Sequence, residues 1–477
     1  MDEVKLPTLL SLRPGVYILI LLVIVISAAI FFVAFYPGIV KGGRYVTFSS
    51  PLSESGVYVD DRYVGAAGYQ YFIESGDHVI TIKKAGITIA SYQLSIDHPV
   101  FLTWLFHRTL QSDAGDISLT EQQKNEIIRF NLEELASQSA ILSFDSVNRY
   151  QPVFSNLIND LKALDLPLSR IQDAIELALL YTTSIEMADE ASQMLQENPG
   201  LVNDKINSIL ASIQNVFDEE SSSERIGTQE KISLQTALER DVLEYGEISI
   251  PGYRYPAASF MMGTETSLRY PDSMATSIDV EVPQFNLASL PVSQYQWALF
   301  LEENPYWDKA NKTTLINEGL VDDQYLEGIT PTTVFVTSRP IINVSYHAAI
   351  AFAQWLSEKT GKQVVLPTEA MWAFAAQSRS STSYDSSLIA APSTRQEPSA
   401  LLGGVWEITQ TPFIPLSRLI DYTRALDLHR QFGLVTQPIV KGGSYLNDPN
   451  TITPYTVGVV EPDVCGDQLG FRIAWYE

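Results

Sequence analysis

The sequence predicts a multidomain protein with a single transmembrane helix, a small antiparallel β domain, an α-helical region and a C-terminal domain of few elements and long loops. Three observations predict this class. An uncharged apolar run lies near the N-terminus, apolar residues then alternate at every second position, and apolar residues at helical spacing follow. A chain of 477 residues with 45% hydrophobic and 18% charged residues is long enough for several packed domains and is neither disordered nor fibrous in composition.

The composition excludes several classes of function. The chain has 31 Lys and Arg against 56 Asp and Glu, a formal net charge of -25. So acidic a surface repels phosphate backbones, and we expect no nucleic-acid partner. A single cysteine, Cys465, excludes an internal disulfide framework, a CxxC metal site and a dithiol redox couple.

The first element is a transmembrane anchor over residues 16–36, preceded by a short cytoplasmic tail, residues 1–15. No Lys, Arg, Asp or Glu occurs between Arg13 and Lys41. At about 1.5 Å per residue, this run matches a hydrocarbon core of about 30 Å. A cleaved signal peptide is the alternative, but the run is longer than a signal core and no convincing small-residue cleavage site follows.

We expect the β domain at residues 40–97. From Tyr45 to Ile96, apolar residues occupy every second position in short segments that are separated by Ser, Gly and Asp turns. At VYVDDRYVG and ESGDHVITIKKAG the segment resembles the PEGA domain, with Asp61 where that family usually has Gly. The resemblance implies an extracytoplasmic spacer or interaction module in bacteria. It places the protein at the bacterial inner membrane, single-pass, with the bulk of the chain facing the periplasm or the cell exterior.

Residues 98–117 are an apolar linker that contains Pro99–Phe106, a run too short to span a bilayer. It either rests in the membrane interface, with Trp104 at headgroup level, or lies as a strand or linker against the β domain. Because no basic residues flank its start, the second interpretation is favoured.

Residues 118–246 form a helical region of three to five helices. Ser118 and Glu121 fit a capping box, and Pro167 lies near a helix start. From Ser118 to Tyr245 there are 22 acidic and 9 basic residues, a net of -13. The favoured interpretation is a solvated face, and a docking face for a basic partner is the alternative.

Residues 247–477 form the C-terminal domain, which carries three clear helix signals. Ser293 with Gln296 predicts a capping box, Ser345 and Gly361 bound a second helix, and Thr368 caps a third.

Seven segments of this domain resemble the formylglycine-generating enzyme family, also called sulfatase-modifying factor domains, in the order of that family's motifs. The segments are FMMG, PVSQYQWALFL, PIINVSYHAAIAFAQWL, LPTEAMWAFAA, GGVWEIT, VKGGSYLND and LGFR. The resemblance covers nearly half of the chain. It implies an α+β, C-type-lectin-like fold with long loops around a small twisted sheet.

The copper chemistry of that family is not expected here. Its oxidising members bind Cu(I) with two cysteines, one shortly after the GGS motif and one five residues later, and those positions are Asn447 and Ile452. An amide and a branched alkane cannot replace thiolates. Cys465 lies between Asp463 and Asp467, whose charges disfavour a thiolate. Copper and formylglycine-generating oxidase activity are therefore not expected.

Calcium is left open by the same comparison. The family's G-N-V-W-E motif supplies an Asn oxygen and a Glu carboxylate to calcium, whereas here the Asn position is Gly404 and only Glu407 remains, as a weak ligand. No other cofactor is expected. Ser444 and Arg472 match the GGS serine and the GFR arginine, and the favoured interpretation is that they satisfy backbone carbonyls.

The sequence favours a non-catalytic binding or scaffold module in the bacterial envelope, with a protein, peptide or glycan ligand. Large aromatic residues offer contact area at low entropic cost. An enzyme with altered chemistry on the same fold, and a structural subunit that docks through the acidic helical region, are the alternatives. The expected binding surface comprises Trp406, Ser444, Tyr445, Asn447, Tyr455 and Arg472.

Overall fold

The computed structural model describes residues 13–103, 105–106, 109–115, 117–144, 150–219, 237–263, 277–329, 339–379, 383–389, 397–415 and 421–477. Most of the expected cytoplasmic tail, and Trp104, therefore lie outside the described residues. The chain forms two compact units, residues 1–130 with 156–166, and residues 131–155 with 167–477.

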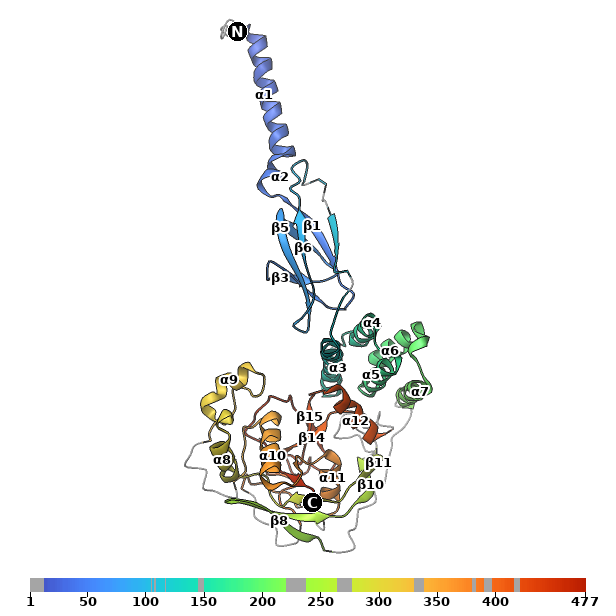
Figure 1. Ribbon diagram of the computed structural model, residues 1–477, viewed down its shortest axis with the longest axis vertical. Helices are drawn as coiled ribbons and strands as arrows, with labels where there is room; N and C mark the ends of the chain where they lie inside the picture. The colour runs from blue at the N-terminus through green and yellow to red at the C-terminus, as the bar shows by residue number, and fades with distance from the viewer. Residues whose placement is uncertain are drawn as a thin grey trace. The chain divides into compact units, whose positions relative to one another are not determined.

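The first unit begins with helix α1, Pro14–Ala34, followed by the short helix α2, Tyr36–Val40 (Figure 1). Proline fits the first turn of a helix because its missing N–H would have no partner there. An 18-residue stretch of α1 has a mean hydropathy of 3.2, and the helix is long and apolar enough to cross a membrane. It begins at Pro14, before the expected start at residue 16.

Among the described residues of this unit, seven strands form the β domain, in two sheets of order β4-β1-β7 and β3-β2-β5-β6. The strands are β1 Gly43–Ser49, β2 Gly56–Val59, β3 Arg62–Ala66, β4 Gln70–Glu74, β5 Gly76–Lys84, β6 Ile87–Ile96 and β7 Thr109–Asp113. Alternate apolar residues such as Val46, Phe48, Ile80 and Ile82 are fully buried. Strand β7 pairs parallel with β1, so part of the expected linker 98–117 is a strand and the domain is not purely antiparallel.

Asp61 lies in the turn between β2 and β3. Asp60 and Asp61 have φ of 50° and 64°, the left-handed region in which glycine is the least strained residue. Asp60 also accepts hydrogen bonds from the backbone N–H of Val79 (2.9 Å) and from His78 Nδ1 (2.7 Å). This hydrogen bond raises the pKa of His78.

In the part of the helical region that the structure describes, five α-helices follow: α3 Glu121–Phe144, α4 Val153–Ala163, α5 Leu168–Leu180, α6 Ile185–Glu197 and α7 Asp204–Glu219. The expected capping box at Ser118 and Glu121 is wrong by two residues. Thr120 and Gln123 form it instead: Thr120 Oγ1 accepts from the Gln123 N–H (3.2 Å), and Gln123 Oε1 accepts from the Thr120 N–H (3.0 Å). In the first unit, a buried ion pair of Lys84 Nζ and Asp160 Oδ2 (2.6 Å) joins the β domain to α4.

The C-terminal domain of the second unit contains a five-stranded sheet of order β13-β18-β12-β9-β8, a four-stranded sheet of order β16-β15-β14-β17, and the pair β10-β11. The strands are β8 Glu239–Tyr245, β9 Ile248–Tyr255, β10 Ala258–Gly263, β11 Ser277–Val282, β12 Phe285–Ala288, β13 Val364–Val365, β14 Trp406–Pro412, β15 Pro438–Lys441, β16 Val457–Val459, β17 Leu469–Gly470 and β18 Ala474–Trp475. Because β8 pairs along its length with β9, this sheet begins before the boundary expected at residue 247.

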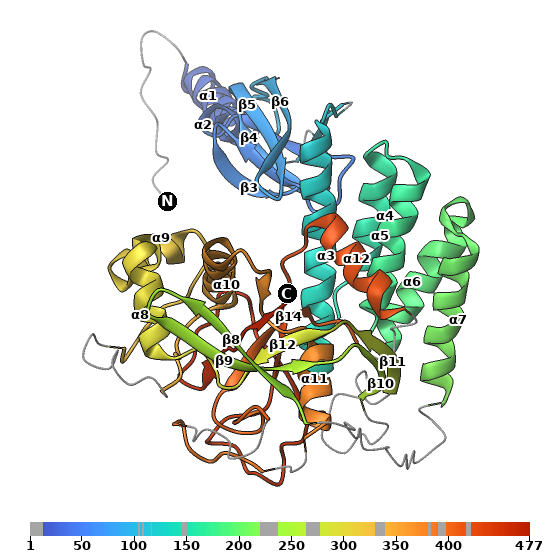
Figure 2. The same ribbon diagram turned by 60° about the horizontal axis from the view of Figure 1, so that its bottom comes forward.

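The helices of this domain are α8 Gln294–Glu303, α9 Lys312–Asn317, α10 Tyr346–Thr360, α11 Glu369–Gln377 and α12 Tyr422–Phe432. The expected caps are confirmed at Ser293 with Gln296, at Ser345 with Gly361, and at Thr368. Helix α10 contacts both β13 and β8, the two edges of the five-stranded sheet. Helix α12 was not expected; it lies in the segment between β14 and β15 and contacts α5 (Figure 2).

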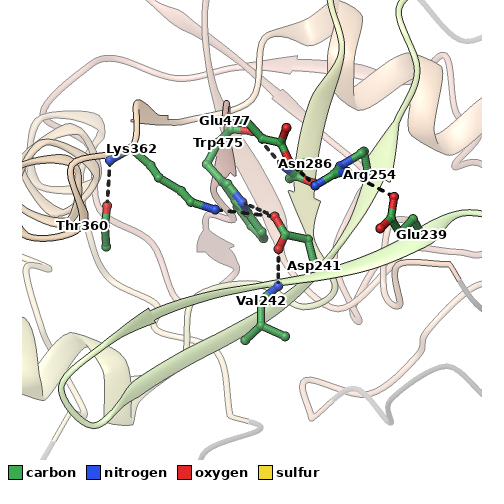
Figure 3. Close-up of polar contacts among 9 residues, drawn as sticks. All are labelled: Glu239, Asp241, Val242, Arg254, Asn286, Thr360, Lys362, Trp475 and Glu477. Atoms are coloured by element: carbon green, nitrogen blue, oxygen red, sulfur yellow. Dashed lines mark hydrogen bonds and ion pairs between the residues drawn. The ribbon is translucent and has the colours of Figure 1, made fainter.

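Polar contacts tie the end of the chain to the first strands of this sheet (Figure 3). Asp241 on β8 accepts a hydrogen bond from Trp475 Nε1 (3.0 Å) and lies 3.8 Å from Lys362 Nζ. Arg254 on β9 pairs with Glu239 (3.1 Å) and with Glu477. Partial burial acts to raise the pKa of Asp241, but the hydrogen bonds and nearby cations outweigh it and the pKa is lowered.

Candidate functional site

The loop that follows β15 carries the positions at which the family's copper ligands were expected. It begins with Gly442, Gly443 and Ser444. Gly443 has φ of 71°, and a Cβ atom there would lie 2.8 Å from the side chain of Ile452. Glycine avoids both this contact and the strain of a positive φ, which explains the second glycine of the GGS motif.

At the two positions that match the family's copper ligands, Asn447 and Ile452 have structural roles. Asn447 Oδ1 lies 2.7 Å from the backbone N of Ser444, which donates to it, and 3.1 Å from Ser444 Oγ. Ile452 is buried, and its branched side chain lies against Gly443. The amide closes a tight turn and the alkane fills the core, so neither offers a donor for Cu(I).

Two further residues hold this loop, and sequence reasoning missed both. Ser444 Oγ lies 2.5 Å from Gln468 Oε1, and the hydroxyl of Tyr384 donates to the carbonyl of Ser444. Gln468 precedes β17 and Tyr384 lies in a loop after α11. No local pattern marks either residue, because both contacts join segments that are distant in the sequence.

The six residues expected at a binding surface do not form one surface. Trp406, Tyr445, Asn447 and Tyr455 are half-buried. Ser444 and Arg472 are fully buried, so the expectation that they face a ligand is wrong. Leu446, in the same loop, is 61% exposed.

Arg472 and Glu407 form a buried ion pair, and both side chains are 0% exposed. Arg472 Nε donates to Glu407 Oε2 (2.6 Å) and Nη2 donates to Oε1, a two-point geometry that suits guanidinium and carboxylate. Glu407 Oε2 also accepts from Trp372 Nε1 (2.9 Å). Both carboxylate oxygens of Glu407 are engaged in the core, which makes Glu407 a poor ligand for the calcium ion that the sequence left open.

Arg472 also donates to backbone carbonyls, as expected from the sequence. Its acceptors are the carbonyls of Ala288 (2.9 Å), Ser399 (3.0 Å) and Ala400 (3.3 Å). One guanidinium therefore connects β12, the segment before β14, and β14 itself.

A second buried pair lies next to the first. Lys441 Nζ is 3.4 Å from Glu369 Oε1 and 5.5 Å from the centre of the Trp372 ring. Burial raises the pKa of Glu369 and lowers that of Lys441, each partly offset by the partner's charge. The two pairs share Trp372 and contain two acids and two bases, so they form a charge-balanced core network.

A pocket of about 680 Å³ lies elsewhere in the domain, against the end of β14, α12 and the segment that follows α12. None of the expected site residues lines it. The hydroxyl and amide side chains in its lining are those of Tyr346, Gln363, Thr368, Gln410, Thr411, Thr436 and Tyr476. Its volume falls in the range of small-molecule sites.

The charge of this pocket is low. His429 Nε2 lies 3.0 Å from Thr436 Oγ1, and burial lowers the pKa of His429 to about 4, so the ring is neutral at pH 7. Burial raises the pKa values of Tyr346 and Tyr476, which stay protonated. Among the described lining residues Arg430 carries the charge, and Asp427 accepts from it (2.6 Å).

Cys465 is buried, and burial together with Asp322 and Asp463 raises the pKa of its thiol. This supports the expectation of a passive cysteine, since the thiolate is the reactive form. Within the described ranges, no group of three or more His, Cys, Asp and Glu side chains is placed to hold a metal ion.

Residues 253–399 and 398–477 match the family described as "Sulfatase-modifying factor enzyme 1-like domain". An uncharacterized protein of Borreliella burgdorferi is 24% identical over 398 residues, which cover 78% of each chain. Among solved structures, PvdO from Pseudomonas aeruginosa shares 15% identity with a TM-score of 0.35 and covers 50% of this chain and 98% of its own.

Two other structures are similar to the same extent. Treponema denticola variable protein 1 shares 14% identity (TM-score 0.35; 50% of this chain, 99% of its own), and CarF shares 15% identity (TM-score 0.32; 48% and 98%). The family match identifies the C-terminal half of the chain as a sulfatase-modifying-factor-like domain, as the motif order predicted.

Proposed function

We propose that this protein is a membrane-anchored, extracytoplasmic binding or scaffold module whose sulfatase-modifying-factor-like domain works without copper. The observation that carries the proposal is the use of both ligand positions for structure: Asn447 closes a turn with Ser444, and Ile452 packs on Gly443. A domain in which these positions support the loop keeps the fold and presents a surface.

The ligand of this module is a peptide or glycan segment that enters the pocket beside α12. Hydroxyl and amide groups line it together with apolar side chains such as Leu426 and Val435. This mixture suits an uncharged polar chain, whose acceptors pair with the hydroxyls and amides. Tyr445, Leu446 and Trp406 form a second contact area on the same domain.

The N-terminal part fixes the module at the bacterial inner membrane. Helix α1 supplies the anchor, with the C-terminal body on the periplasmic or outer side. The β domain is a PEGA-like spacer, a proposal supported by the position of the quoted motif residues on the paired strands β2 and β5. Asp61, in a turn where glycine fits best, also supports it.

Part of the acidic face of the helical region is used within the protein. Arg424 on α12 donates to Asp173 (2.7 Å) and Glu176 (3.4 Å) on α5, and Lys205 lies 2.6 Å from Glu176. These acids hold α12 beside the pocket. This favours a binding module over a subunit that docks through these helices.

Photo-crosslinking in intact cells tests the proposal. A photoreactive residue replaces Val435 at the pocket, Leu446 on the loop, or Ile185 on α6, side chains that are 47%, 61% and 56% exposed. We expect a defined adduct, identified by mass spectrometry, at Val435. The adduct should disappear when Gln410→Trp fills the pocket and should persist with Ile316→Trp on α9.

Adducts confined to Ile185 would overturn the proposal in favour of a docking subunit. Conversion of a cysteine-containing sulfatase-type peptide to its aldehyde by the purified protein would overturn it in favour of an enzyme.

A further inference from the structure

Large apolar side chains are exposed next to the end of helix α1. They come from helix α2 and from the segment before β7. These side chains are Ile39 (49% exposed), Val40 (65%), Val100 (41%), Phe101 (47%), Leu105 (53%) and Phe106 (58%). We call these six residues the juxtamembrane collar. The interior of the β domain does not cover them, contrary to the favoured interpretation of the linker.

Direct contacts fasten the two parts of the collar to the end of α1. The backbone N–H of Leu102 donates to the carbonyl of Ala34 (2.6 Å), and the rings of Phe35 and Phe101 lie 5.2 Å apart. A Cβ atom on Gly38 would lie 2.5 Å from the carbonyl oxygen of Val100, so glycine allows this close approach. The collar thus begins where the apolar helix ends.

The arrangement also separates apolar from charged groups. No Asp, Glu, Lys or Arg occurs between Pro99 and Phe106. Lys41 follows α2 directly and its Nζ lies 4.6 Å from the centre of the Phe72 ring, while Arg44 pairs with Asp97. Apolar area contiguous with a membrane-spanning segment is stabilised in the headgroup and acyl boundary region, and the charges beyond it stay in water.

We propose that the juxtamembrane collar inserts into the leaflet at which α1 leaves the bilayer, so that the β domain is held against the lipid surface. The occupant of this apolar face is the lipid bilayer, because the face is continuous with the anchor. This inference rests on the proposed membrane anchor, and it adds a second lipid contact that fixes the β domain close to the membrane.

Depth-dependent fluorescence quenching tests the inference on the full chain in phosphatidylcholine vesicles. In a Cys465→Ser background, a single cysteine labelled with an environment-sensitive dye replaces Phe106, or Leu22 within α1, or Tyr69 in the β domain. The register places Gln70 opposite Thr47, so Tyr69 lies at the end of β1 that is distant from α2. Nitroxide groups are placed at shallow or deep positions on the lipid.

We expect the Phe106 probe to be quenched several-fold more than the Tyr69 probe, and most strongly by the shallow nitroxide, while the Leu22 probe responds to the deep one. Quenching at Leu22 with a Phe106 signal equal to that of Tyr69 would overturn the collar and leave the anchor in place, with a partner protein as the occupant. Absence of quenching at Leu22 would overturn the anchor and the collar together.

Discussion

Replacing Arg472 by Met should strongly destabilise the C-terminal domain. The guanidinium is fully buried, pairs with Glu407 through two nitrogens, and donates to three backbone carbonyls. Methionine fills similar space but leaves the Glu407 carboxylate buried with Trp372 as its remaining hydrogen-bond donor. Breaking a buried pair on one side costs about 3–5 kcal/mol, and each carbonyl left without a donor adds to this.

Urea unfolding followed by tryptophan fluorescence measures the effect. Of the 7 tryptophans, all except Trp104 lie between residues 297 and 475, so the signal reports on this domain. With a slope of about 2 kcal/mol per molar urea, the expected loss lowers the midpoint by about 2 M.

The matched control is Arg430→Met, which removes an exposed pair with Asp427 and should cost less than about 1 kcal/mol. The double variant Glu407→Gln with Arg472→Met should recover part of the loss, because no buried charge is then left alone. A midpoint for Arg472→Met equal to that of Arg430→Met would refute the structural role, and Arg472 would again be a candidate for ligand contact.

Three other substitutions test the remaining parts of the fold. Arg424→Ala removes the contacts of α12 with Asp173 and Glu176 on α5. Because these ion pairs are partly exposed, we expect the free energy of unfolding to fall by about 1 kcal/mol and amide exchange in α12 to become faster. Unchanged amide exchange in α12 would contradict the contact. The hydrogen bond of His78 with Asp60 raises the pKa of His78 from 6.5 and lowers that of Asp60 from 3.8. The stabilisation by charged His78 is therefore complete below pH 6.5 and is lost as the pH rises through the folded-state pKa of His78. The stabilisation by ionised Asp60 is present above pH 3.8 and is lost as the pH falls through the lowered pKa of Asp60. Thermal melts of Asp60→Asn should lack this dependence, and a wild-type profile in that variant would refute it. Asp61→Gly should stabilise the β domain by about 0.5 kcal/mol, because relief of the left-handed strain at Asp61 outweighs the entropy that glycine adds to the unfolded chain. A lower melting temperature of this variant would show that the entropy of the unfolded chain dominates.

Local sequence signals predicted the ends of several helices. Ser293, Ser345, Thr368 and Gly361 act where expected, because caps depend on a few neighbouring residues. Overlapping signals were ambiguous. Ser118 and Thr120 are each followed three residues later by Glu or Gln, as a capping box requires, and Thr120 is the residue that caps α3.

Helix α12 had a signature that was overlooked. Asp421 caps it by accepting from the N–H of Arg424, and Gly433 follows it with φ of 63°. Its buried residues Ala425, Leu428 and Phe432 have helical spacing.

The candidate site was only partly predictable. The order of motifs identified the domain, and residue matching located Asn447 and Ile452 in the loop after β15. The partners of that loop, Tyr384 and Gln468, and the pocket beside α12 depend on contacts between distant segments. Likewise, the sequence did not show that Glu407 and Arg472, which lie 65 residues apart, neutralise each other in the core.

A titration of the full chain with Cu(I) in competition with a thiol chelator tests the central claim most directly. With Asn447 closing a turn and Ile452 in the core, we expect no uptake by the wild-type protein beyond that of the Cys465→Ser variant. The double variant Asn447→Cys with Ile452→Cys is the positive control, since it restores two thiolates at the family's positions. Tight uptake of one Cu(I) per wild-type chain that survives Cys465→Ser would contradict the account.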